Sequence, residues 1–358
     1  MMSSINSCLF FVIFICTFIC KVNSLPRFAN YYQDHMVLQR APQRAVVWGY
    51  SDTSNSPITL TMNGRVYTTN AADQIWSVTL DAQSEEGPFD IHVNQPLTNG
   101  TVVTITLHDI LFGDVWICSG QSNMQFSVYE MLNATIEIDN AGKYPKVRFM
   151  TTQHNQSETL EEELLGITLN WTIASPDSVG SNFTSAVCWL YGRMIHQALG
   201  GRPMGLVHTS WGATEIEFWA PKQALQACNV TNDLGIIVNN SVLYNAMIHP
   251  LTRMVIKGAI WYQGEDNIRV HTALYPCMFS KMIETWRSVW HERTKSLTDP
   301  NFPFGFVQLS TKTKDPDTIG GFPWVRWHQT FDVGHVPNDV VQNVFMASAM
   351  DLRDDDAP

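Results

Sequence analysis

The hydrophobic pattern of residues 25–110 consists of short runs in which apolar and polar positions alternate. Alternation with a period of two is typical of strands with one buried face, and Gly, Asn and Pro separate the runs. The runs occupy residues 46–49, 58–62, 65–69, 76–80, 89–93 and 101–107. Residues 25–110 therefore predict a small β-rich, sandwich-like domain.

From residue 111 the pattern changes, because compact apolar runs begin to alternate with longer segments of helical period. Strands are predicted at Asp114–Ser119, Gly205–Ser210, Ile256–Gln263, Phe304–Leu309 and Val344–Met350. Helices are predicted at Ala186–Leu199, Ser241–Ile248 and Met278–Trp290, and Met124–Leu132 could open another. Such alternation predicts an α/β domain over residues 111–358 with a mostly parallel sheet. Ligands of these folds bind at the carboxyl ends of the strands.

The N-terminus carries one apolar stretch, Cys8–Cys20, which is too short to span a membrane comfortably. Small residues at 22–24 follow it, so residues 1–24 are interpreted as a secretory signal peptide; an uncleaved anchor is the alternative. No other segment is a membrane candidate. Glycosylation sequons start at Asn99, Asn133, Asn155, Asn170, Asn182, Asn229 and Asn239. Together these features predict a lysosomal or extracellular glycoprotein.

Composition narrows the choice of partners. The chain is 45% hydrophobic and 15% charged, and its formal net charge of −11 argues against nucleic acid or an anionic membrane as the main partner.

No Cys or His spacing resembles a metal site, and no metal or organic cofactor is expected. Four cysteines remain after residue 24, and one or two disulfides are plausible, with their pairing left open. Most of the 12 Trp and 10 Tyr are expected in the core, although a sugar-binding cleft would also use them.

Candidate chemistry begins with Gly120-Gln-Ser-Asn-Met124, which follows the predicted strand Asp114–Ser119. A hydrolase places its nucleophile at such a strand-to-helix turn, where the hydroxyl of Ser122 points outward and the helix N-terminus favours negative charge. The alternative is an ordinary turn in which Ser or Asn caps the helix.

Two further motifs follow predicted strands. Gly212 lies after Gly205–Ser210, and its backbone N–H could approach a substrate closely; a simple tight turn is the alternative. The polar run Gln263–Asn267 follows an apolar strand, and such a run is costly unless something uses it. Asn267 could donate to an oxyanion and Glu265 could orient a neighbour, whereas helix capping is the alternative.

Taken in order, these motifs resemble the Ser-Gly-Asn-His type serine esterases, and within them the sialate O-acetylesterase family. The resemblance implies Ser122 as nucleophile, an oxyanion hole formed by the N–H groups of Ser122 and Gly212 with the Asn267 side chain, and support from Gln121 and Glu265. It also implies an acyl-serine reaction that removes acetyl groups from free or glycan-linked O-acetylated sialic acids with water as second substrate. The segments that carry it are residues 28–30, 35–39, 112–124, 210–217, 261–267, 326–329 and 349–352.

One part of the family pattern is missing. The family's catalytic histidine follows the Asp-Leu segment in an Ile-His-Pro motif, but this sequence ends at Pro358 without one. The hydrolase domain is therefore expected to be truncated and the chain weakly active, since loss of a triad member costs on the order of 10⁴–10⁶ in kcat. Asp332 and His335 have a spacing that could form a substitute pair, whereas His208 and His328 are expected to be core histidines. The rival functions are an acetylesterase for other glycans and a glycan-binding protein without turnover.

Overall fold

A computed structural model describes residues 26–231, 240–311 and 320–352. The predicted signal peptide and the sequon at Asn239 lie outside these ranges. Within them, no helix is long and apolar enough to cross a membrane.

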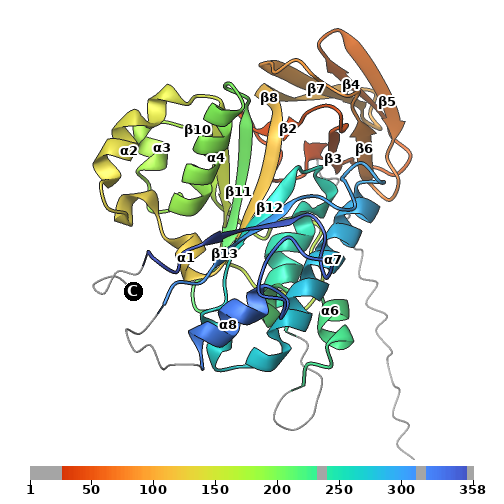
Figure 1. Cartoon of the computed structure of the whole chain (residues 1–358). Helices are drawn as coiled ribbons and strands as arrows, with labels where there is room; N and C mark the ends of the chain where they lie inside the picture. Colours follow the sequence, from red (N-terminus) through yellow and green to blue (C-terminus); the bar gives the residue numbers. More distant parts are fainter. Residues whose placement is uncertain (1–25, 232–239, 312–319, 353–358) are drawn as a thin grey trace, which may run out of the picture.

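Residues 26–120 form strands and turns, and no helix is described among them. β1, β3 and β6 make a three-stranded sheet, while β4 pairs with β5 and β7, and β7 pairs with β8. These strands lie at the top of Figure 1. Their bounds are β1 (Arg27–Phe28), β2 (Val37–Gln39), β3 (Val46–Tyr50), β4 (Pro57–Met62), β5 (Arg65–Asn70), β6 (Ile75–Thr79), β7 (Phe89–Pro96) and β8 (Val102–Gly120).

Strand β8 joins the two parts that the sequence divided. The runs predicted as separate strands at 101–107 and 114–119 form one strand of 19 residues. Its first half pairs with β7, and its last seven residues pair with strands of the larger sheet. One hydrophobic core also includes residues from both sides of position 110. The sharp boundary at residue 110 therefore falls inside a continuous strand, and a separate N-terminal domain stays a prediction.

The larger sheet carries the predicted α/β architecture in a mixed form. Six strands run parallel in the spatial order β9-β11-β8-β12-β13-β14, which is 2-3-1-4-5-6 when they are numbered along the chain; without β9 the other five have the order 2-1-3-4-5. Antiparallel β10 pairs with β9 at the edge of the sheet. Strand order reverses at β8, and crevices at such reversals bind ligands in doubly wound folds. The bounds are β9 (Val147–Thr152), β10 (Ile167–Ile173), β11 (Met204–Ser210), β12 (Gly258–Tyr262), β13 (Phe304–Gln308) and β14 (Val344–Ser348).

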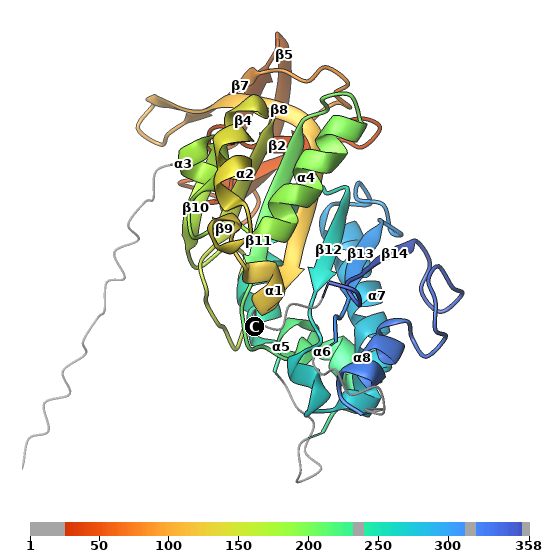
Figure 2. The same cartoon turned by 60° about the vertical axis from the view of Figure 1, so that its left-hand side comes forward.

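Helices cover both faces of this sheet, with α4 on one face and α7 on the other (Figures 1 and 2). Alternate residues of β8 enter two different cores: Trp116 and Cys118 pack toward α4, whereas Val115 and Ile117 join the core that contains α7. The helices are α1 (Ser122–Gln125), α2 (Ala134–Asn140), α3 (Pro176–Val179), α4 (Ala186–Ala198), α5 (Ile216–Trp219), α6 (Lys222–Ala227), α7 (Tyr275–Arg293) and α8 (Phe322–Gln329). Short 3-10 or π turns occupy Val128–Glu130, Ala141–Lys143, Tyr244–Ile248, His249–Arg253, Asp266–Ile268 and Thr272–Leu274.

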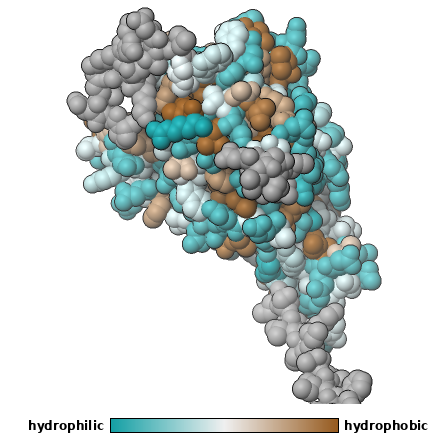
Figure 3. Space-filling model, turned by 90° about the horizontal axis from the view of Figure 1, so that it is seen from below, coloured by the Kyte–Doolittle hydropathy of each residue, from teal (hydrophilic) through white to brown (hydrophobic). Residues whose placement is uncertain are grey.

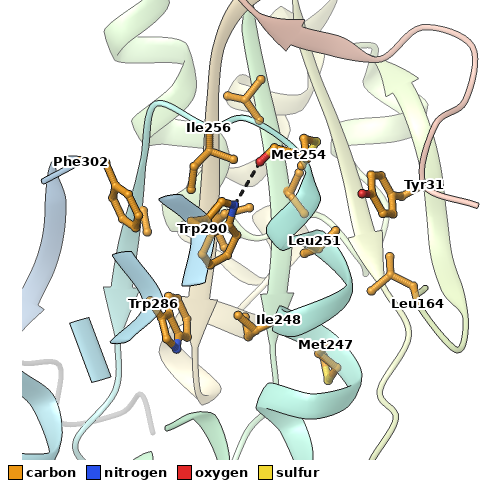
Figure 4. Close-up of a cluster of buried hydrophobic side chains, with 14 of the residues drawn as sticks. Tyr31, Leu164, Met247, Ile248, Leu251, Met254, Ile256, Trp286, Trp290 and Phe302 are labelled. Carbon is orange, nitrogen blue, oxygen red and sulfur yellow. Dashed lines mark hydrogen bonds between the residues drawn. The ribbon is translucent and has the colours of Figure 1, made fainter. Parts of the chain in front are cut away.

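The core beneath α7 reaches the N-terminal strands. Trp286 and Trp290 of α7 pack among aliphatic side chains of residues 247–256, and Tyr31 lies at the far side of the same cluster (Figure 4). The indole N–H of Trp290 donates to the Met254 carbonyl oxygen at 3.1 Å. The indoles therefore bury their apolar area without leaving this polar group unpaired.

Two disulfides show how the four cysteines after residue 24 are paired. Cys118 of β8 is bonded to Cys188 of α4, and Cys228 after α6 is bonded to Cys277 of α7. Each bond ties a helix on one face of the sheet to a neighbouring element. The two disulfides therefore use all four cysteines that follow residue 24.

The other predicted elements differ mainly in extent. The helix expected over Met124–Leu132 is only the short α1, followed by a 3-10 turn, and the segment 241–248 is largely a π turn. Strands β1, β2, β9 and β10 and helices α2, α3, α5, α6 and α8 were not predicted.

Candidate active site

Three loops leave the sheet at one edge. In the strand pairing, Gly120 at the end of β8 lies opposite Ser210 of β11 and Tyr262 of β12. The turns that carry Ser122, Gly212 and Gly264–Asn267 therefore start at the same level, beside the reversal in strand order. Figure 3 looks from this end of the molecule, where hydrophobic patches lie among polar ones.

Ser122 stands on a sharp turn that requires glycine before it. Gly120 has φ +140°, and a Cβ on it would lie 2.1 Å from the Tyr262 carbonyl oxygen. Helix α1 begins at Ser122, whose side chain is exposed. No hydrogen bond from a described residue engages its hydroxyl or its backbone N–H. The turn thus presents a hydroxyl and a free N–H donor together at a helix N-terminus.

Gly212 lies directly against this serine. A Cβ built on Gly212 would be 3.5 Å from the Ser122 Cβ, so the two residues are immediate neighbours and no side chain stands between them. The Gly212 N–H donates to the side-chain oxygen of Gln125 at 2.6 Å. The structure therefore brings the predicted nucleophile and the predicted glycine donor together, with the donor engaged by Gln125.

Gln121 joins the first and third motifs. Its amide nitrogen donates to Asp266 Oδ2 at 2.6 Å, and its amide oxygen accepts from the Gly264 N–H at 3.2 Å. Gln121 is buried, with an exposed fraction of 1%. This side chain therefore links the Gly264–Asn267 turn to the residue that precedes Ser122.

Glu265 supports the residue next to the nucleophile. Its Oε1 accepts from the amide of Asn123 at 2.6 Å, while its Oε2 is buried without a hydrogen-bond partner. Burial raises the pKa of the Glu265 carboxyl above its ordinary value, an effect that the hydrogen bond from Asn123 opposes. Glu265 therefore restrains Asn123 and has a raised affinity for a proton.

Asn267 does not take the position implied by the resemblance. It is fully buried, and its amide nitrogen donates to Glu217 Oε2 at 2.9 Å and to the Val270 carbonyl oxygen at 3.2 Å. Its amide oxygen accepts from the Ile216 N–H and from Gln263. Since both amide hydrogens are committed to the protein, none is left for an oxyanion. In this structure Asn267 is a scaffold residue, and its expected role as oxyanion donor is corrected accordingly.

None of the described histidines makes a hydrogen bond to Ser122. His208 is buried between the Ser210 hydroxyl, at 2.6 Å from Nε2, and the Phe183 carbonyl oxygen, at 3.3 Å from Nδ1. Burial lowers its pKa to about 4, so the ring is neutral, as expected for a core histidine. Asp332 pairs with His328 at 2.5 Å and His335 is exposed, so the substitute pair Asp332–His335 does not form.

Aromatic and buried polar groups near the site were not singled out from the sequence. His154 stacks on Trp211, next to Gly212, with ring centroids 4.6 Å apart. Gln125 was also overlooked, although it lies three residues after Ser122, a spacing that places two helix residues on one face. His271 pairs with Glu217 at 2.6 Å and so anchors the buried network around Asn267.

The sequons differ in accessibility. Five of their asparagines are exposed in the described residues, namely Asn99, Asn133, Asn170, Asn182 and Asn229. Asn155 differs, because its side-chain nitrogen is buried without a partner, and a glycan would have to be joined to that atom. The folded structure therefore argues against Asn155 as a glycosylation site, while the other described sequons stay predictions.

Metal binding is not indicated in the described ranges, where no group of three or more His, Cys, Asp or Glu side chains could hold an ion.

Comparison with known proteins gives consistent matches. Residues 112–357 match the family model of carbohydrate esterases described as sialic acid-specific acetylesterase. The chain is 42% identical to sialate O-acetylesterase of Homo sapiens over 349 residues, which cover 93% of this chain and 66% of that protein. It is 40% identical to sialate O-acetylesterase of Mus musculus, covering 93% and 69% respectively. The crystal structure of XAC1771, a carbohydrate acetylesterase from Xanthomonas citri, matches with a TM-score of 0.76 and 27% identity over 90% of this chain and 68% of that chain.

Proposed function

Because the chain belongs to the sialic acid-specific acetylesterase family of carbohydrate esterases, we propose that it is a serine esterase that removes acetyl groups from O-acetylated sialic acids. The observation that carries this proposal is the position of Ser122 at a strand-to-helix turn immediately beside Gly212. The relatives named sialate O-acetylesterase support the substrate class. The chain spans 66% of the length of the human relative.

The reaction uses Ser122 as nucleophile. Its Oγ forms a bond to the acetyl carbonyl carbon and loses its proton, and the carbonyl oxygen becomes an oxyanion. The N–H groups of Ser122 and Gly212 stabilise that oxyanion. Collapse breaks the bond to the sugar oxygen, which takes up a proton and leaves as a hydroxyl. Water then attacks the acetyl-serine; one of its protons returns to Ser122 Oγ and the other is released with the acetate, and no metal or cofactor takes part in these steps. The proton that Ser122 loses in the first half is balanced by the one that the sugar oxygen takes up.

Two tryptophans near the site are consistent with a carbohydrate substrate. Trp324 and Trp327 of α8 are 49% and 45% exposed, and α8 packs against the Asp266–Ile268 turn. Exposed indoles offer flat apolar faces on which sugar rings stack. This favours a sugar that extends from the serine across α8, and includes glycan-linked sialic acid among the proposed substrates.

The finer description of the fold and location belongs to the same proposal. The strand order supports a flavodoxin-like hydrolase domain over residues 111–358, with residues 25–110 as a β-rich accessory domain. Two disulfides and five exposed sequons support passage through the secretory pathway to a lysosomal or extracellular location.

The test is an ester panel on the purified chain and its Ser122→Ala variant. We expect release of acetate from O-acetylated sialic acid that exceeds release from acetylated xylan and is abolished in Ser122→Ala. Faster release from xylan would replace the substrate class by other acetylated glycans. Saturable binding of sialic acid with no acetate release in either protein would replace the esterase by a glycan-binding protein. This rival is favoured by the observation that no described residue forms a hydrogen bond to the Ser122 hydroxyl and could act as its base.

A further inference from the structure

Gln125 places a carbonyl oxygen where the proposed reaction develops its oxyanion. The Gln125 oxygen lies 2.6 Å from the Gly212 nitrogen. A Cβ built on Gly212 would lie 3.1 Å from that oxygen and 3.5 Å from the Ser122 Cβ, so the three residues are immediate neighbours. Oxyanion-hole donors lie about 2.7–3.1 Å from the oxygen they stabilise, and the amide oxygen of Gln125 satisfies Gly212 in the same way.

The short helix α1 explains this position. Ser122 is its first residue and Gln125 its last, and residues three apart on a helix lie on the same face. Met124, between them, is completely buried in the core beside α4. The turn that exposes the nucleophile therefore also directs Gln125 toward Gly212.

A single hydrogen bond holds the Gln125 side chain among the described residues. The bond from Gly212 engages its oxygen, whereas its amide nitrogen has no partner there, and the residue is only half-buried. By contrast, the Asn267 amide is locked by four hydrogen bonds in a buried network. Of these two amides near the site, Gln125 is the one that a ligand could displace.

We propose that Gln125 is an internal occupant of the oxyanion hole, which the ester carbonyl must displace before Gly212 can stabilise the transition state. This inference rests on the proposed function. When no substrate is bound, the Gly212 N–H donates its hydrogen bond to Gln125. This bond must break each time an ester carbonyl takes the place of the Gln125 oxygen. Gln125 therefore acts as a positioning residue that lowers the reactivity of the site through competition for one donor.

The test is the rate at which an alkyl fluorophosphonate labels Ser122, followed by intact mass. Ser122 Oγ bonds to phosphorus, fluoride leaves and the serine proton is lost to solvent, so the phosphonyl oxygen needs the same donors as an oxyanion. We expect Gln125→Ala to label about fivefold faster, the factor that corresponds to one neutral hydrogen bond. Gln125→Glu should label more slowly, because a carboxylate accepts more strongly and repels the developing charge. Gln226→Ala, a change at an exposed helical glutamine of α6, is the matched control and should label at the wild-type rate.

Two outcomes separate this inference from the proposed function. If wild type labels at Ser122 and Gln125→Ala labels no faster, the inference is overturned while the nucleophile stands. If Ser122 is not labelled in any variant, the proposed function fails, and hydrogen exchange of the Gly212 amide decides the occupancy. Exchange should be faster in Gln125→Ala than in wild type and Gln226→Ala, and equal exchange in all three would refute the contact.

Discussion

Replacing Gly120, the glycine before the turn that carries Ser122, should strongly destabilise the folded protein. Its φ of +140° is a conformation that residues with a Cβ rarely adopt. In Gly120→Ala the new Cβ would lie 2.1 Å from the Tyr262 oxygen, and the Tyr262 carbonyl carbon and nitrogen would be at 2.7 and 2.9 Å. These are backbone atoms of the neighbouring strand, so relief requires β8 and β12 to separate at their carboxyl ends.

The expected cost has two parts. A residue held in a rare backbone conformation costs about 1–3 kcal/mol, and an overpacked contact costs about 1–3 kcal/mol more. Gly120→Ala should therefore lower the free energy of unfolding by about 4 kcal/mol. Gly64→Ala is the matched control, because Gly64 also has positive φ, +72°, but nothing lies within 4 Å of its added Cβ. This control carries the backbone term alone, about 1–2 kcal/mol.

Guanidinium unfolding followed by tryptophan fluorescence, with the disulfides intact, measures both variants. We expect Gly120→Ala to be the less stable by at least about 2 kcal/mol, the excess that the overpacked contact adds. Any folded Gly120→Ala protein should also label more slowly with fluorophosphonate, because Ser122 moves away from Gly212. If the two variants lose equal stability, the close approach of β8 and β12 does not exist and the description of the turn is wrong.

Three further outcomes are expected. Asn267→Ala should lower the free energy of unfolding by about 3 kcal/mol, because it leaves buried partners unpaired; unchanged stability would return Asn267 to the role of oxyanion donor. Replacing both Cys118 and Cys188 by Ser should cost about 4 kcal/mol, as expected for a bond that closes 70 residues, and equal unfolding midpoints would contradict this. In the folded chain the pKa of His208 is lowered to about 4 from its ordinary 6.5. As the pH falls, the unfolded chain therefore binds a proton at this histidine before the folded chain does, and the free energy of unfolding should fall by about 3 kcal/mol between pH 6.5 and pH 4. His208→Gln should reduce that slope in unfolding curves measured at several pH values, and an unchanged slope would refute the assignment.

A buried charged side chain explains why strand β9 was missed while β11 and β12 were predicted. β11 and β12 carry few charged side chains, so their apolar runs are visible in the sequence. β9 contains Arg148, which looks like a surface residue but is only 5% exposed. Its guanidinium pairs with Asp109 at 3.0 Å and donates to the His35 carbonyl oxygen at 3.0 Å. Arg148 can be buried in a strand because Asp109, which is distant in the sequence, pairs with it. The hydrophobic period of residues 147–152 alone does not reveal such a partner.

The same limit applies to the active site. Strand ends and glycines are local features, and they predicted that Ser122, Gly212 and the Gly264–Asn267 turn would lie at one edge of the sheet. The choice between two chemically equivalent amides is not local, because it depends on which hydrogen bonds each one already makes. Asn267 lies in the motif but spends its donors on Glu217 and Val270, whereas Gln125 lies outside the motif and contacts the donor beside the nucleophile. A full account of each buried N–H and C=O group is therefore what distinguishes a residue that supports the loop from one that competes for the oxyanion hole.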